Sequence, residues 1–538
     1  MPTTSEFPDV EYPIDLPLWT LLFDSKYSVL HDRDPARVRG FRDGTTGQFF
    51  LYSTLRDLST TGCVGLKRQY QLRPGQAACI FGLNSIWYPV ALFSVLRAGG
   101  LVCGASPAST VGEMTHYLKL AAAKIIFTSK EFLPTALAAA KAVNLGKEHI
   151  ILLDGEMAGF SSIFHLVEEG KNLENASSDE AYKFSPGEDA TSVCGFLSFS
   201  SGTTGLPKAV QISHANMIAQ SVLPFFHIAG LSQLTFVPFF LNQEVAILAK
   251  FEIRSMLEAV TKYKVNEMWL VPPIVIRLVN DPAASEYDLS KVRNLIYGAA
   301  PMSNEVIAAV KQKYPHFILR QTWGMTEVCG AATTCAPQYQ GFEYAHTVGK
   351  ALGSMSVKVV DPISGEEVPA GEPGEIMVKG PNVTMGYLDN PKATRETFEP
   401  DGWLHSGDLG TIDDKGFIII QDRIKELIKV KGIQVAPAEL EDLLLGNPLV
   451  EDVAVIGVSD PYAGELPKAF VVLKDKTANL AQARQKLLQF VKRRLSRHKW
   501  LDGGIEFVGE IPKSTSGKIL RRVLKDKAVK ETMIASRL

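Results

Sequence analysis

The sequence predicts an α/β protein in which a large N-terminal body of α/β subdomains precedes a small C-terminal α/β domain. Three observations support this fold class. Residues 77–128 alternate short apolar runs with longer mixed runs, as strands and helices of a parallel sheet do. Similar strand-like runs recur up to about residue 320. After about residue 350, short strands lie between Gly, Pro and Asp clusters, and a smaller alternation of helices and strands follows.

The first part of the body is expected to be a β-α-β-α-β unit. Its strands are predicted at residues 77–82, 101–104 and 124–128, and its helices at 86–96 and 111–122. Parallel strands joined by helices in this way have right-handed crossovers.

The rest of the body continues the same pattern. Further strands are predicted at residues 192–200, 268–271, 293–297 and 317–319. A helix is predicted over Asn304–Lys313, because Val306, Ile307 and Val310 are spaced for one helical face.

The last third of the chain is expected to contain the domain boundary. Its predicted strands are 375–379, 416–421, 453–458 and 469–473, and its predicted helices are 438–445 and 480–495. The segment Asp422–Gly432 is charged and ends in glycine, so it is predicted to be a hinge between residues 1–421 and residues 433–538.

Composition excludes several classes of protein. The chain has 538 residues, with 56 Lys and Arg against 58 Asp and Glu, and this balance argues against a nucleic-acid-binding protein. Six scattered cysteines without a CxxC pair are typical of reduced, buried thiols. The acidic start of the chain does not have the pattern of a signal peptide. The most apolar stretch, Ile86–Ala105, contains Arg97 and two glycines, so it is interpreted as core rather than as a membrane span.

The segment Ser198–Val210, SFSSGTTGLPKAV, has the composition of a phosphate-binding loop. Small residues let backbone N–H groups turn toward an anion, hydroxyl groups add donors, and Lys208 adds a positive charge. The segment lacks the GxxxxGK[ST] pattern, so it is not a Walker A loop.

Six further segments follow in order. They are LPFFHIAG, YGAAP, QTWGMTE, WLHSGD, DRIKELIKVKGIQVAPAELE and PKSTSGKILRR. With these seven motifs the chain resembles the adenylate-forming superfamily, which includes acyl-CoA synthetases, 4-coumarate–CoA ligases, luciferases and adenylation domains of peptide synthetases. The resemblance runs from about residue 45 to the end and implies a luciferase- or acyl-CoA synthetase-like fold. It also implies an enzyme that joins a carboxylic acid to AMP from ATP and then to a thiol, usually that of coenzyme A.

The resemblance implies a site for the triphosphate and Mg²⁺. The residues that match the family's phosphate loop are Ser200, Ser201, Gly202, Thr203, Thr204, Gly205 and Lys208. Glu327 and Thr204 are the implied Mg²⁺ ligands, and Thr326 is expected to contact the α-phosphate. A carboxylate beside a triphosphate is favourable only through a metal ion.

The resemblance also implies a nucleoside site and an acyl pocket. Asp408 and Arg423 are expected to bind the ribose, and Trp323 takes the place of the aromatic residue that stacks on adenine. The backbone on the other side of the adenine is that of Ala299, Ala300 and Pro301. His227 matches the histidine that orients the carboxylate at the mouth of the acyl pocket.

The C-terminal domain is implied to supply the remaining charged groups. Lys518 matches the family's catalytic lysine, which bridges the acyl carboxylate and the α-phosphate. Lys518 must leave before a thiol can enter, which explains why a hinge is needed. The other matched positions are Lys425 at the hinge, Lys429 and Gln434 as assisting residues, and Lys431 and Gly432 beside the pantetheine tunnel.

The acid is only partly defined by the sequence. The expected pocket is apolar and aromatic, and FFHIAG has no acidic group to pair with an amino group, so amino acids are disfavoured. Thr322 replaces the family's usual glycine and is expected to narrow the pocket. Aryl acids and medium-chain aliphatic acids both remain open. A stand-alone adenylation enzyme that loads a carrier protein and a luciferase-like oxygenase are the alternative functions.

The chain ends in Ser536–Arg537–Leu538. This tripeptide is similar to the peroxisomal signal S-K-L, with Arg in place of Lys. It predicts a peroxisomal location and an import receptor as a partner. If the tripeptide is not a signal, a cytoplasmic location is expected.

Overall fold

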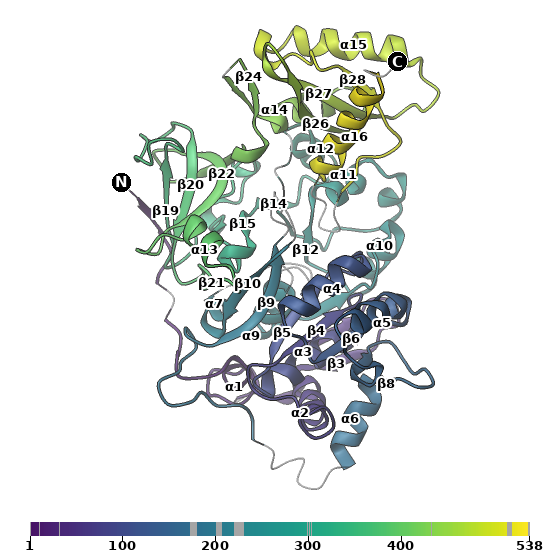
Figure 1. Ribbon diagram of the computed structural model, residues 1–538, viewed down its shortest axis with the longest axis vertical. Coiled ribbons are helices and arrows are strands. Elements are labelled where there is room, and N and C mark those ends of the chain that lie inside the picture. The colour runs from purple at the N-terminus through teal and green to yellow at the C-terminus, as the bar shows by residue number, and fades with distance from the viewer. Residues whose placement is uncertain are drawn as a thin grey trace.

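The computed structural model describes the whole chain except residues 1, 10, 32, 173–179, 201–206, 220–230, 299, 301, 303, 432, 514–518 and 536–538. Figure 1 shows a large body and, at one end of the long axis, a smaller C-terminal unit. Within the described residues, no helix has the length and apolar character needed to cross a membrane.

A mixed eight-stranded sheet forms the centre of the body. Its order is β21-β10-β9-β5-β4-β6-β7-β8, and strands β9, β5, β4, β6, β7 and β8 run parallel. The strands are β4 (Ala77–Phe81), β5 (Leu101–Ala105), β6 (Ile125–Thr128), β7 (Ile150–Leu152), β8 (Ser161–Ser162), β9 (Cys194–Ser200), β10 (Lys208–Ser213) and β21 (Gly386–Tyr387). Strand β10 pairs antiparallel with both β9 and β21. The predicted strands at 77–82, 101–104, 124–128 and 192–200 are therefore confirmed.

Helices pack against this sheet. They are α3 (Trp87–Arg97), α4 (Val111–Leu120), α5 (Leu133–Ala142) and α6 (Ile163–Asn172), and α2 (Tyr52–Gln69) packs on α3 and α6. Helix α4 begins at a capping box, in which Thr110 accepts from the Glu113 N–H and Glu113 accepts from the Thr110 N–H. In α3, every residue from Tyr88 to Arg97 is buried. The apolar stretch 86–105 is therefore core, as predicted.

A second parallel sheet contains the other predicted strands of the body. It consists of β12 (Glu267–Leu270), β13 (Asn294–Tyr297) and β14 (Ile318–Gln321). The helices α10 (Ile253–Lys262), α11 (Pro272–Asn280) and α12 (Asn304–Lys313) accompany it. The helix predicted over 304–313 has the predicted bounds.

A third, antiparallel sheet follows after residue 350 and includes the N-terminal strand. It contains β1 (Thr3–Thr4), β19 (Ser356–Val360), β20 (Gly374–Lys379), β22 (Leu404–Ile412) and β23 (Ile418–Arg423), in that order. The strands β2 (Gly40–Asp43), β3 (Phe49–Leu51) and β11 (Val245–Ile247) form a separate three-stranded sheet. The short remaining elements are α1 (Leu18–Phe23), α7 (His214–Ala219), α9 (Val237–Phe240), β15 (Gly324–Met325), β16 (Gly330–Ala331), β17 (Thr333–Thr334), β18 (Lys350–Ala351) and α13 (Pro391–Thr397).

The C-terminal unit has its own sheet and its own core. Its elements are β24 (Ile428–Val430), β25 (Ile433–Val435), α14 (Pro437–Leu445), β26 (Val450–Asp460), β27 (Gly464–Leu473), α15 (Leu480–Lys492), β28 (Ile505–Phe507) and α16 (Arg521–Ala535). Leu440, Val455, Val471 and Leu487 lie in the buried cluster between the sheet and its helices. The predicted strands 453–458 and 469–473 are parts of the longer strands β26 and β27, which pair antiparallel as one hairpin. The helix predicted to reach residue 495 ends at Lys492.

The segment predicted as a hinge is mostly structured. Residues 422 and 423 finish β23, residues 424–426 form a 3-10 turn, and residues 428–430 form β24 of the C-terminal sheet. Only the turn and Leu427 therefore stand between the two sheets.

Candidate active site

Asp408 is the centre of a buried polar cluster between β14 and the third sheet. Its side chain is almost fully buried. The indole Nε1–H of Trp323 donates to Asp408 Oδ2 at 2.8 Å, and Arg423 Nε lies 3.2 Å from Oδ1. Asp408 and Arg423 are register partners on β22 and β23. Trp323, Asp408 and Arg423, which were predicted separately as nucleoside-binding residues, thus lie together.

The backbone of β22 just before Asp408, where the register with β20 shifts, is fixed by a carboxylate that the sequence analysis did not identify. Gly407 has a φ of +70°, a conformation that favours glycine, and its N–H donates to Glu375 Oε1 at 2.9 Å. The other oxygen of Glu375 lies 3.0 Å from Nδ1 of His405, whose Nε2 lies 3.0 Å from Glu399. These contacts hold the backbone that presents Asp408.

Glu327 forms a second buried cluster. It lies in the 3-10 turn Thr326–Val328, which ends at Cys329 in the left-handed region. The backbone carbonyl of Glu327 accepts from both the N–H and the hydroxyl of Thr384. Its side chain is only 6% exposed, and Tyr387 O–H donates to Oε1 at 2.8 Å.

Tyr387 also connects Glu327 to the lysine of the phosphate motif. Lys208 Nζ lies 4.4 Å from the centre of the Tyr387 ring. Strand β21 brings Tyr387 to this place by pairing it with Val210 on β10. Burial, together with the charge of Glu327, raises the pKa of the Tyr387 hydroxyl, which therefore stays a hydrogen-bond donor. Sequence reasoning missed Tyr387, because the Gly-Tyr pair at 386–387 has no distinguishing local signal.

Thr322, which directly follows β14, is held in place by a hydrogen bond to Thr333. Its hydroxyl donates to the Thr333 carbonyl at 2.7 Å, and Thr333 Oγ1 accepts from the N–H of Trp323. A methyl group built on Gly298 would lie 3.3 Å from Thr322 Cγ2, so the two backbones are closely packed there. Ala300, on the same loop, is half-buried.

The predicted residues of the C-terminal unit form a separate group. Lys429 and Gln434 are exposed register partners on the β24–β25 hairpin. Lys431 has a φ of +52°, and its Nζ lies 4.4 Å from the centre of the Tyr462 ring. Lys425 is exposed in the turn Ile424–Glu426, which we call the linking turn because it lies between the third sheet and the C-terminal sheet.

Two known protein families match this chain. The AMP-binding enzyme family matches residues 32–388, and the C-terminal domain of AMP-binding enzymes matches residues 439–518. The chain belongs to the AMP-binding enzymes, within the adenylate-forming superfamily.

Named relatives of this AMP-binding enzyme match it over most of its length. The peroxisomal OPC-8:0-CoA ligase 1 of Arabidopsis thaliana is 34% identical over 507 residues, which cover 90% of this chain and 89% of that protein. The 4-coumarate–CoA ligase 2 of Petroselinum crispum is 34% identical over 549 residues, which cover 97% and 96%. ATP-bound MatB from Rhodopseudomonas palustris superposes with a TM-score of 0.80 at 26% identity, covering 95% and 98%.

Several predicted positions of this AMP-binding enzyme lie outside the described residues. They are Ser201, Gly202, Thr203, Thr204, Gly205, His227, Ala299, Pro301, Gly432, Lys518 and Ser536–Leu538. Ser200 and Lys208, which flank the phosphate loop, are described at the ends of β9 and β10.

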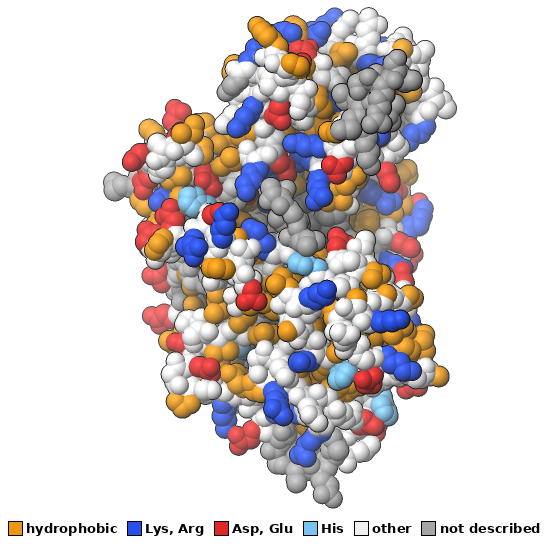
Figure 2. Space-filling model, in the orientation of Figure 1, with side chains coloured by type: hydrophobic (Ala, Val, Ile, Leu, Met, Phe, Trp, Pro, Cys, Tyr) orange, Lys and Arg blue, Asp and Glu red, His pale blue; other side chains and the backbone are white. Residues whose placement is uncertain are grey.

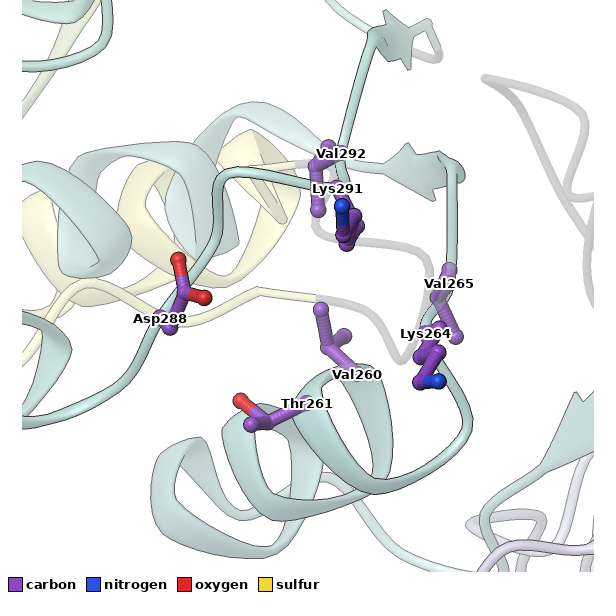
Figure 3. A pocket seen from close by; sticks show the side chains of 7 residues that line it. All are labelled: Val260, Thr261, Lys264, Val265, Asp288, Lys291 and Val292. Carbon is purple, nitrogen blue, oxygen red and sulfur yellow. The ribbon is translucent and has the colours of Figure 1, made fainter.

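The surface near the junction of body and C-terminal unit carries Lys and Arg side chains on the face shown in Figure 2. Positive charge there favours polyanionic ligands such as ATP and coenzyme A. By contrast, a small pocket of about 110 Å³ between α10 and the loop before β13 is lined by Val260, Lys264, Asp288 and Lys291, among others (Figure 3). None of the predicted site residues lines that pocket.

Proposed function

We propose that this AMP-binding enzyme is an ATP-dependent ligase that joins a carboxylic acid to coenzyme A, releasing AMP and pyrophosphate. The observation that carries this proposal is the match to plant CoA ligases over up to 97% of the chain, C-terminal unit included. The buried cluster of Trp323, Asp408 and Arg423 supports the first half-reaction, because an ionised acceptor beside a guanidinium suits a ribose with two hydroxyl groups.

In the proposed first step, a carboxylate oxygen of the acid attacks the α-phosphorus of ATP. The bond from that phosphorus to the bridging oxygen of the β-phosphate breaks, and pyrophosphate leaves. Lys208 and the loop 200–205 hold the phosphates, and Lys518 bridges the two reacting anions. His227 orients the carboxylate, and Thr326 contacts the α-phosphate. Such groups act by positioning and by compensating negative charge.

The surroundings of Glu327 fit a magnesium ion that is shared with ATP. Within the described residues no cluster of three or more His, Cys, Asp or Glu could hold a metal. A single buried carboxylate fits Mg²⁺, which is commonly held by one or two carboxylates plus substrate phosphates and water. Glu327 would supply that carboxylate, with Thr204 as a hydroxyl ligand, and the ion would offset the charge of the phosphates.

In the proposed second step, the sulfur of coenzyme A attacks the acyl carbon and AMP leaves with the oxygen that came from the acid. The thiol proton is released. Residues 433–538 rotate against residues 1–421 about the segment 422–432, so that Lys518 withdraws and the thiol can enter. Lys429 and Gln434 assist at this stage, and Lys431 and Gly432 border the pantetheine.

The proposed substrate is an aryl acid or a medium-chain aliphatic acid without a second charge. Thr322 supports a restricted pocket, because its side chain packs closely against Gly298. A peroxisomal location is also proposed. It is supported by the match to a peroxisomal CoA ligase.

Pyrophosphate release across a panel of carboxylic acids, with and without coenzyme A, tests the proposal. A CoA ligase should release pyrophosphate with one class of acid, and the rate should rise when coenzyme A is added. If release does not respond to coenzyme A and acyl-adenylate accumulates, the acceptor is a carrier protein or the second step is different.

A further inference from the structure

A buried ion cluster lies in the C-terminal unit, outside the residues discussed so far. The side chain of Arg521 is 15% exposed. Its Nη2 donates to both carboxylate oxygens of Glu441, at 2.8 and 2.7 Å, and its Nη1 donates to Glu426 at 2.6 Å. Arg521 Nε also donates to the carbonyl of Val455 at 3.3 Å.

The cluster connects four parts of the chain. Arg521 begins α16, Glu441 lies on α14, Val455 lies on β26, and Glu426 ends the linking turn next to Lys425. Glu441 in addition accepts from the N–H of Val455 at 2.7 Å. One guanidinium therefore joins the start of α16 to the linking segment and to the core of the C-terminal unit.

Stability alone does not explain such a cluster. Burial by itself lowers the pKa of Arg521, and the charges of Glu441, Glu426 and Asp422 outweigh that effect and raise it. Buried ion pairs are often no more stabilising than apolar residues of similar volume, because desolvation offsets the attraction. What the cluster does provide is a fixed geometry. The guanidinium is planar, and its three nitrogens donate in set directions to three different partners.

The Arg521 cluster lies directly beside the segment that carries Lys518. Lys513 and Ile519 are paired as an antiparallel bridge, and Leu520 N–H donates to the Pro512 carbonyl at 2.8 Å. The chain therefore enters and leaves residues 514–518 at the same place. Lys513 Nζ donates to Asp452 on the entering side at 2.6 Å, and Arg521 holds the leaving side.

We infer that Arg521 is a positioning residue for Lys518. It ties the start of α16, three residues after Lys518, to Glu426, so that the chain that leaves residues 514–518 stays fixed to the turn 424–426 as the C-terminal unit moves. This inference rests on the proposed function, in which Lys518 acts only during adenylation. Loss of Arg521 should therefore impair adenylation more than transfer to coenzyme A, because a small misplacement of a catalytic group lowers the rate by up to about 100-fold.

The test compares Arg521→Met with Arg522→Met. Arg522 is the next residue, its side chain is 77% exposed, and its ion pair with Asp526 is a weak 3.9 Å contact. Two half-reactions are measured for each full-length variant: acid-dependent exchange of pyrophosphate into ATP, and thiolysis of a preformed acyl-adenylate. Arg521→Met should lose at least about tenfold in exchange and less than about threefold in thiolysis. Arg522→Met should stay within about twofold in both, and Arg521→Lys should recover part of the exchange.

Lys518→Ala separates failure of this inference from failure of the proposed function. If Lys518→Ala keeps full exchange, the proposed role of the lysine is wrong. If Lys518→Ala loses exchange but Arg521→Met keeps it, or if folded Arg521→Met loses both half-reactions equally, the positioning role of Arg521 is overturned. Should Arg521→Met not fold, Glu426→Gln replaces it, because Glu426 is less buried than Glu441. Glu426→Gln should then reduce exchange and spare thiolysis, and equal rates to the parent protein would overturn the inference.

Discussion

Replacing Tyr387 by Phe removes one hydroxyl group from the centre of the site. The hydroxyl donates to Glu327 Oε1 at 2.8 Å inside a buried cluster. A hydrogen bond to a charged group contributes about 1.5–3 kcal/mol, which corresponds to a factor of roughly 10 to 150. The ring itself should stay in place, because β21 pairs with β10 and Phe398 packs edge-on against the ring. The change therefore acts on the orientation of the Glu327 carboxylate.

The expected result is a loss that depends on the metal. If Glu327 binds Mg²⁺ together with the phosphates, Tyr387→Phe should weaken the binding of MgATP about tenfold or more and leave the binding of ATP in EDTA nearly unchanged. Isothermal titration calorimetry measures both affinities without turnover. Tyr314→Phe is the matched control, because its buried hydroxyl donates to the Leu278 carbonyl on α11, away from the candidate site.

Two outcomes would refute this reasoning. MgATP binding that equals that of the unmodified protein would mean that the hydroxyl does not orient Glu327. An equal loss with and without Mg²⁺ would mean that Tyr387 acts on the nucleotide and not through the metal ligand.

Three further predictions follow from burial and charge. Asp408→Asn keeps the shape of the side chain but removes the charge beside Arg423. KM for ATP should therefore rise about tenfold, while KM for the acid stays constant. An unchanged KM for ATP would contradict the role of Asp408 in binding the ribose. Burial raises the pKa of Glu441 to about 7 from 4.5. The folded state therefore keeps this proton longer, so the contribution of Glu441 to the free energy of unfolding should fall as pH rises from about 4.5 to 7 and level off above. In urea unfolding series, the difference between the parent protein and Glu441→Gln should change over this range by at most about 1.4 kcal/mol per pH unit, and a constant difference would contradict the shift. Burial also raises the pKa of Cys79 to about 12 and that of Cys329 still further, so both should resist Ellman's reagent at pH 8 until guanidinium is added, and fast labelling of the native protein would show that they are accessible.

Local periodicity was sufficient for the individual elements of the body. The β-α-β-α-β unit over 77–128 agrees with the structure to within two residues at each end, because each run has one clear period and a turn after it. Membership of sheets was not predictable in the same way. Strands β12, β13 and β14 belong to a separate sheet, since pairing depends on contacts between distant segments and not on the runs themselves.

The candidate site shows the same division. Trp323, Asp408 and Arg423 could be predicted from motifs, and the structure places them in contact. Tyr387 could not, because only its register with Val210 brings it to Lys208 and Glu327.

Arg521 and Arg522 differ in a way that the sequence does not reveal. The two are adjacent and identical in type within SGKILRR. At the start of α16, however, only Arg521 points to the buried carboxylates, while Arg522 lies at the surface. The phase of the helix on its sheet decides which arginine is structural, and that phase is a property of the packed unit.

The central claim is that the acid is activated by bonding one of its oxygens to the α-phosphorus of ATP. The most direct test uses an acid labelled with ¹⁸O in both carboxylate oxygens, with coenzyme A present and AMP analysed by mass spectrometry. The account predicts one ¹⁸O atom in each AMP formed, because thiolysis breaks the bond between acyl carbon and oxygen. Unlabelled AMP, or ADP with the label in inorganic phosphate, would contradict it.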